Sequence, residues 1–137
     1  MLKAKSRKII QDLAKKYHLK TIIVFGSTAK KKTREKSDID MAILANADFY
    51  EKDFSNFNYD MMKVEEIEKR DIEITPISNQ NPILLFNIFN DGIPVYIRDK
   101  EEYYRLRSWA RFSYEESRRF FYGREKLLEK RMEKLKL

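Results

Sequence analysis

The sequence contains no cysteine and a single histidine, His18. Without cysteine there can be no disulfide framework, no thiolate metal site and no cysteine nucleophile. One histidine also excludes most zinc sites and most serine–histidine chemistry. A catalytic site in this chain would therefore need the chemistry of carboxylates.

Glycine and proline are also scarce, with three residues of each in 137. No flexible linker is visible, and we expect a single domain over residues 1–137, with a core at about 8–98 and a C-terminal helical extension at about 100–137. No apolar run approaches the ~18 residues that span a bilayer. The N-terminus lacks the apolar stretch of a signal peptide. We therefore expect a cytoplasmic protein without a membrane partner.

Basic residues outnumber acidic ones, 29 to 22, and the net charge is +7. This balance favours a polyanionic partner or substrate, with nucleic acid or a nucleotide first. Much of the charge lies in two segments, residues 30–36 with a net +4 and residues 118–137 with about +5. Either could contact nucleic acid directly, but such runs are more often solvated faces, so direct nucleic-acid binding is not favoured.

The pattern of apolar residues predicts an α/β fold, a small mixed sheet flanked by helices with a long helix at the C-terminus. Proline at position 76 should end the third strand, and the segment 48–69 should become helical by Met61 after an irregular stretch at residues 53–58. Aromatic residues on the last helix should be core or partner-facing positions. The expected strands are 21–25, 38–44, 70–75 and 95–98, and the expected helices are residues up to about 16, 61–69, 83–90 and 101–133.

Two aspartates, Asp38 and Asp40, begin the second predicted strand. Side chains at i and i+2 of a strand point the same way, so these carboxylates share one face at ~7 Å along the strand. They repel each other unless a cation lies between them, and Mg²⁺ is usually held by one or two carboxylates together with substrate phosphates. An acidic outer face on a half-exposed strand would give the same pattern.

Gly26 and Ser27 directly follow the first predicted strand. A glycine and a hydroxyl residue at this point leave backbone N–H groups and a side-chain donor that can bind phosphate, although a simple turn has the same residues. Ten residues separate this pair from Asp38. At about 6% for each residue, the combined pattern arises by chance in on the order of two chains in a thousand of this length.

The third predicted strand adds Asp71 and Glu73 on one face. A third carboxylate across from the first pair would complete a two-metal site, in which cations stabilise the attacking and leaving oxygens of a displacement at phosphorus. The alternative is an exposed acidic strand face beside basic neighbours.

Through residues 24–27 (Val-Phe-Gly-Ser), 37–40 (Ser-Asp-Ile-Asp) and 71–74 (Asp-Ile-Glu-Ile), the sequence resembles a minimal nucleotidyltransferase of the polymerase-beta-like superfamily. The order of elements is similar to that of the MNT antitoxins that accompany HEPN-domain toxins. The resemblance implies that Gly26 and Ser27 contact the triphosphate. It also implies that Asp38, Asp40 and Asp71 hold Mg²⁺, with Glu73 as the alternative third ligand.

The same resemblance implies a function. ATP would be the donor, and AMP would pass to a tyrosine hydroxyl of a cognate HEPN-domain RNase toxin, which neutralises it. Thr28-Ala-Lys-Lys follows Ser27 where the family often has Arg-Ala-Arg-Gly. Two alternatives therefore stay open: a fold that has lost catalysis and neutralises its partner by binding, and a transferase that acts on a small molecule or on RNA.

Overall fold

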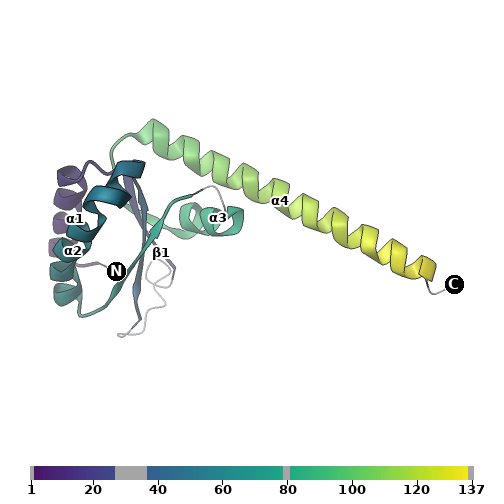
Figure 1. Cartoon of the computed structure of the whole chain (residues 1–137), viewed down its shortest axis with the longest axis horizontal. Helices are drawn as coiled ribbons and strands as arrows, with labels where there is room; N and C mark the ends of the chain where they lie inside the picture. Colours follow the sequence, from purple (N-terminus) through teal and green to yellow (C-terminus); the bar gives the residue numbers. More distant parts are fainter. Residues whose placement is uncertain (1, 27–36, 79–80, 136–137) are drawn as a thin grey trace.

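The computed structural model describes residues 2–26, 37–78 and 81–135. It forms a four-stranded mixed sheet with helices on both faces (Figure 1), as the sequence predicts. In chain order the elements are α1 (Ala4–Lys16), β1 (Thr21–Phe25), β2 (Ile39–Leu44), the π-helical turn η1 (Phe49–Asp53), α2 (Phe54–Glu68), β3 (Ile72–Pro76), α3 (Pro82–Asp91), β4 (Ile93–Ile97) and α4 (Lys100–Leu135).

The strands lie in the order β3-β2-β1-β4. β1 pairs antiparallel with both β2 and β4, whereas β2 and β3 are parallel and are joined through α2. A parallel pair needs a crossover of this kind, while an antiparallel pair needs only a short connection. The C-terminal end of β1 and the N-terminal ends of β2 and β3 consequently lie side by side at the same end of the strands.

One face of the sheet packs against α1 and α2. Alternate residues of β1 and β2 supply the strand side of this core, and the helices supply the other side. The buried side chains from these elements are Ile10, Ala14, Ile22, Val24, Ile39, Met41, Ile43, Phe57, Met61 and Val64. Tyr17 ties the two helices together, because its hydroxyl donates a 2.5 Å hydrogen bond to Asp60.

The opposite face carries Ile23 and Ala42 and is covered by α3 and the first turns of α4. Leu85, Ile88 and Phe89 of α3 fill this second core together with Tyr103 and Ala110 of α4. Phe86 of α3 also stacks on Tyr114 of α4, with the ring centroids 4.1 Å apart. Odd and even residues of β1 and β2 thus separate between the two layers.

Residues 53–58 are helical, where the sequence led us to expect an irregular stretch. A π-helical turn over Phe49–Asp53 leads directly into α2. Asp, Ser and Asn in this stretch favour turns when taken alone. Here Phe49 packs edge-to-face against Phe57 and Tyr17, so tertiary contacts override the local preference.

The two prolines of the sheet lie inside strands. Pro76 is the last residue of β3 rather than the residue after it, and Pro94 is the second residue of β4. Both strands are edges of the sheet, where a missing N–H removes no ladder hydrogen bond on the outer side. The prediction that Pro76 stops the strand and that β4 begins at Val95 was therefore wrong by one or two residues.

The second half of α4 extends beyond the rest of the fold (Figure 1). Every described side chain from Arg118 onward is exposed. Trp109, Phe112, Phe120 and Phe121 are exposed too, so these aromatics are not core positions; Tyr103 and Ala110 are the buried residues of this helix. Within residues 2–26, 37–78 and 81–135, no helix is both long and apolar enough to cross a membrane. The basic segment 30–36 lies outside the described residues.

Candidate active site

The paired aspartates lie at the start of β2. Asp38 directly precedes the strand and is exposed, and Asp40 is its second residue and is partly buried. Ile39 and Met41 are buried on the face covered by α1 and α2. Asp40 therefore lies on the opposite face, in line with Ala42, as the alternation of the strand requires.

Gly26 lies directly against the carboxylate of Asp40. Phe25, its neighbour in the chain, is the strand partner of Asp40. The backbone of Gly26 has φ +73°, and a Cβ built there would come within 2.4 Å of Oδ2 of Asp40. Only glycine combines this backbone conformation with so close an approach. The sequence prediction thus placed together two residues that do meet, while Ser27 lies outside the described residues.

Both acids of the third predicted strand lie beside the pair, in different rows. Glu73 and Asp40 are partners in the parallel pairing of β3 with β2. Asp71 lies two register positions earlier, where its carbonyl oxygen accepts a 2.8 Å hydrogen bond from the N–H of Ile39. Glu73 is therefore the acid next to Asp40, and Asp71 lies nearer to Asp38.

Arg70 holds the starts of β2 and β3 together, and our reading of the sequence missed it. Its Nε donates a 2.6 Å hydrogen bond to the carbonyl oxygen of Ser37. One terminal nitrogen lies 3.3 Å from the Ser37 hydroxyl and 3.4 Å from the carbonyl oxygen of Asp38. An arginine directly before an acidic strand was the available signal, since an arginine fork can bind several acceptors at once.

The charges around Asp40 oppose its ionisation. Partial burial raises the pKa of this carboxyl, and the negative charges of Glu73 and then Asp38 raise it further. The positive charge of Arg70 acts in the other direction. Like-charged carboxylates on adjacent strands favour a proton or a cation between them.

Magnesium suits the donors present, because Mg²⁺ prefers carboxylate oxygens. Without a cation, the carboxylates of Asp38 and Glu73 repel that of Asp40. Within the part of the chain that the structure describes, no group of three acidic or histidine side chains is close enough to enclose a metal ion.

Comparison with known families agrees with this arrangement. Residues 7–101 match the family described as polymerase beta, nucleotidyltransferase. The match covers all four strands, most of α1, and the whole of α2 and α3. The chain belongs to this nucleotidyltransferase family.

Solved structures with the same fold come from toxin–antitoxin complexes. A chain of a toxin–antitoxin complex with AMP-PNP is 18% identical, with a TM-score of 0.61 over 92% of this chain and 98% of that chain. A chain of the MntA–HepT complex is 16% identical, with a TM-score of 0.59 over 95% and 99%. A third match, 15% identical with a TM-score of 0.58 over 93% and 97%, comes from a tri-AMPylated HEPN toxin of Shewanella oneidensis in complex with MNT antitoxin. None of the curated protein sequences compared with this chain gives a significant match.

Proposed function

We propose that this chain is an antitoxin that transfers AMP from ATP to a tyrosine hydroxyl of a HEPN-domain toxin. Family membership supports nucleotidyl transfer as the reaction class. The fold shared with toxin–antitoxin chains, one of them with an ATP analogue and one with an AMPylated toxin, supports the donor and the acceptor.

The close approach of Gly26 to Asp40 is the observation that carries the proposal. It brings the turn after β1 against the carboxylate of Asp40, the second aspartate of the pair. In the proposed complex, backbone N–H groups at this turn and the Ser27 hydroxyl bind the triphosphate. Asp38, Asp40 and a carboxylate of β3 hold Mg²⁺.

Mg²⁺, when bound, would neutralise charge that develops on the phosphate oxygens. The residues of the chain position the α-phosphorus opposite the acceptor hydroxyl. The hydroxyl oxygen then bonds to the α-phosphorus as the bond to the bridging oxygen breaks, and pyrophosphate leaves. The hydroxyl proton passes to one of the carboxylates of β2 and β3. The products are an AMP–tyrosine ester on the acceptor and pyrophosphate.

Glu73 is the third carboxylate that the register favours over Asp71, because it shares a row with Asp40. We expect Glu73→Gln to lower AMP transfer at least a hundredfold and Asp71→Asn to lower it less than tenfold, as a metal-site carboxylate contributes far more to the barrier than its neighbour. Initial rates with α-labelled ATP would separate the two. Equal losses, or a larger loss in Asp71→Asn, would assign the third position to Asp71.

The direct experiment is label transfer from α-labelled ATP, with Mg²⁺, to a purified HEPN-domain partner. Asp38→Asn and Asp40→Asn should abolish transfer while leaving the circular-dichroism spectrum unchanged. Label in RNA or small molecules alone would indicate the transferase with a different acceptor. If the Asp40→Asn protein still neutralises the toxin in cells, the chain acts by binding.

A further inference from the structure

The face of α4 that packs on the fold continues past the fold. About 18 residues make five turns of an α-helix, so residues 18 apart lie on the same line along it. Tyr103, Ala110, Tyr114 and Ser117 are buried or partly buried at the start of the helix. Five turns further on, the same lines carry four exposed apolar side chains, Phe121, Leu128, Met132 and Leu135.

We call these four residues the distal stripe. Their exposed fractions range from 49% for Leu128 to 85% for Leu135. α3 covers the first half of the same helix face, with Phe86 against Tyr114. The distal stripe thus has the composition of a packed helix face without a packing helix among the described residues.

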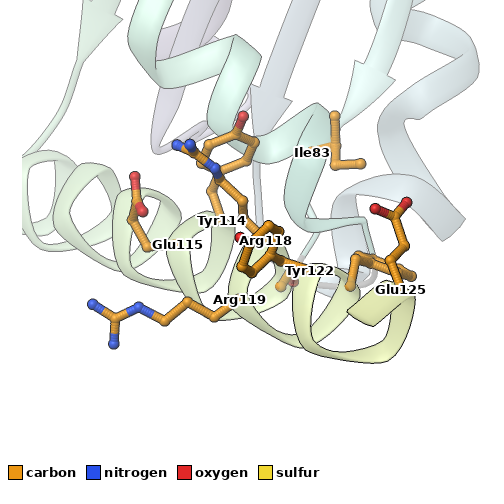
Figure 2. Close-up of a pocket in the computed structure, with 9 residues that line it drawn as sticks. Ile83, Tyr114, Glu115, Arg118, Arg119, Tyr122 and Glu125 are labelled. Carbon is orange, nitrogen blue, oxygen red and sulfur yellow. The ribbon is translucent and has the colours of Figure 1, made fainter. Parts of the chain in front are cut away.

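A hollow of about 640 Å³ lies between the first turn of α3 and the start of the distal stripe. In Figure 2, Ile83 of α3 lies across from Tyr114 and Tyr122 of α4, and Arg119 points away from the space between the helices. Ile83 is itself 53% exposed. An apolar side chain from a partner could fill this hollow while the rest of its helix lies along the stripe.

Charge selects the chemistry of the partner. Residues 118–135 hold seven basic and three acidic side chains, a net +4. Arg124 and Arg131 follow one border of the stripe, and Glu125 and Glu129 follow the other. The net +4 together with the arginine border favours acidic residues at the matching border of a partner helix. A second copy of this chain would place +4 against +4, which opposes self-association.

Protein fits this surface better than RNA does. Three of the four stripe residues, Leu128, Met132 and Leu135, are aliphatic. Single-stranded nucleic acid is bound by basic side chains along its backbone together with aromatic rings on which its bases stack, and the three aliphatic residues offer no stacking platform. A helix with an apolar seam matches all four residues.

The stripe also lies on the correct side of the sheet. α3 and α4 cover the face that carries Ala42, and Asp40 lies on that same face two residues away. A protein held on α4 beyond α3 would therefore stand on the side of the sheet to which Asp40 belongs.

We propose that the distal stripe and the hollow beside it dock an acidic amphipathic helix of the protein that accepts AMP. This inference rests on the proposed function for the identity of the acceptor. Docking on a helix outside the catalytic domain holds the acceptor near the carboxylates, so its hydroxyl reacts at a high effective concentration.

Two adjacent leucines provide the test. Leu127 and Leu128 have similar exposure, 52% and 49%, but they point about 100° apart. Leu128 is in the stripe, whereas Leu127 lies five turns from the exposed Trp109. Leu128→Arg and Leu127→Arg change the charge equally. Titration calorimetry of the full chain with a purified HEPN-domain partner should show at least tenfold weaker binding for Leu128→Arg and less than a twofold change for Leu127→Arg.

Three kinds of result would overturn the docking proposal. Equal affinities for both variants, or no binding by the unchanged chain, would remove the stripe from the interface. A dimer of the chain alone that Leu128→Arg dissociates in sedimentation would make it a self-association surface. Binding of a labelled RNA 18-mer that only Leu128→Arg weakens would make it an RNA surface. A chain that binds as expected but transfers no AMP would refute the proposed function and leave the docking site standing.

Discussion

Asp40 is held in the folded chain at an electrostatic cost. Burial and the charges of Glu73 and Asp38 raise its pKa above the ordinary value of 3.8. Well below pH 3.8 the carboxyl is protonated in both the folded and the unfolded chain, so it does not lower stability there. The loss of stability grows as the pH rises from the unfolded-state pKa to the raised folded-state pKa, and it is complete above the folded-state pKa. A residue that lowers stability in this way is common at catalytic sites.

Replacing Asp40 by asparagine should therefore stabilise the metal-free protein. We expect Asp40→Asn to raise the melting temperature by about 2 °C at neutral pH, and the difference should vanish near pH 3. Differential scanning calorimetry over that pH range measures it. Asp12→Asn, an equal charge change at an exposed site on α1, should have no effect.

Mg²⁺ should reverse the order of the two proteins. A cation that binds only the folded site stabilises it in proportion to the logarithm of its concentration. The melting temperature of the unchanged chain should rise with added Mg²⁺, whereas that of Asp40→Asn should stay constant. A parallel rise in both would place the bound ion elsewhere.

Gly26 and Gly123 form a second contrast at the residue scale. Gly26→Ala places a Cβ at positive φ against the Asp40 carboxylate, and it should cost about 1–2 kcal/mol of unfolding free energy. Gly123→Ala meets nothing within 4 Å in the middle of α4, and alanine should favour the helix there by about 0.5–1 kcal/mol. Urea unfolding and helical circular dichroism measure the two effects. A Gly26→Ala protein of unchanged stability would contradict the close approach described here.

At the scale of elements, Arg70 links β2 to β3 through two separable properties. Its fork binds the backbone at Ser37 and Asp38, and its charge lowers the pKa of Asp40. Arg70→Lys keeps the charge but loses the fork, so it should cost about 1 kcal/mol of stability and leave that pKa nearly unchanged. Arg70→Gln should lower stability and should also raise the pKa of Asp40. Carboxyl NMR titration of Asp40 distinguishes them, and identical titrations in both variants would exclude a role for the charge.

Elements with a strong periodic pattern were predictable from the sequence. β1 has the predicted bounds, α1 ends at Lys16 as expected, and β2 begins one residue later than predicted. The stretch before α2 was not predictable, because its helical form depends on contacts of Phe49 with residues far away in the chain. Pro76 and Pro94 could be strand residues only because β3 and β4 are edges, and strand order is not visible in local pattern.

The site was predictable in its composition but not in its pairing. The sequence named Asp38, Asp40, Asp71 and Glu73 as candidates, because spacing along one strand fixes which side chains share a face. Only the register between β2 and β3 shows that Glu73, not Asp71, is the partner of Asp40. Arg70 escaped notice because its contacts are to backbone atoms across strands, which leave no mark in the composition.

At the scale of the whole molecule, the fold separates two tasks. The sheet places Asp40 of β2 beside Glu73 of β3, with Asp38 directly before β2. The half of α4 that extends beyond the rest of the fold carries exposed apolar residues. The acids alone would not select a protein acceptor, and α4 alone would not perform chemistry. In the proposed reaction the carboxylates and α4 act together, because AMP is transferred to a protein that is docked on α4.

The most direct measurement compares ATP labelled at the α-phosphate with ATP labelled at the γ-phosphate, each incubated with the full chain, Mg²⁺ and the purified HEPN-domain partner. The account predicts that the α-label appears on a tyrosine of the partner and that the γ-label leaves with pyrophosphate, with no labelling by Asp40→Asn. A partner that binds the chain but takes up neither label would contradict it. So would a partner that takes up the γ-label.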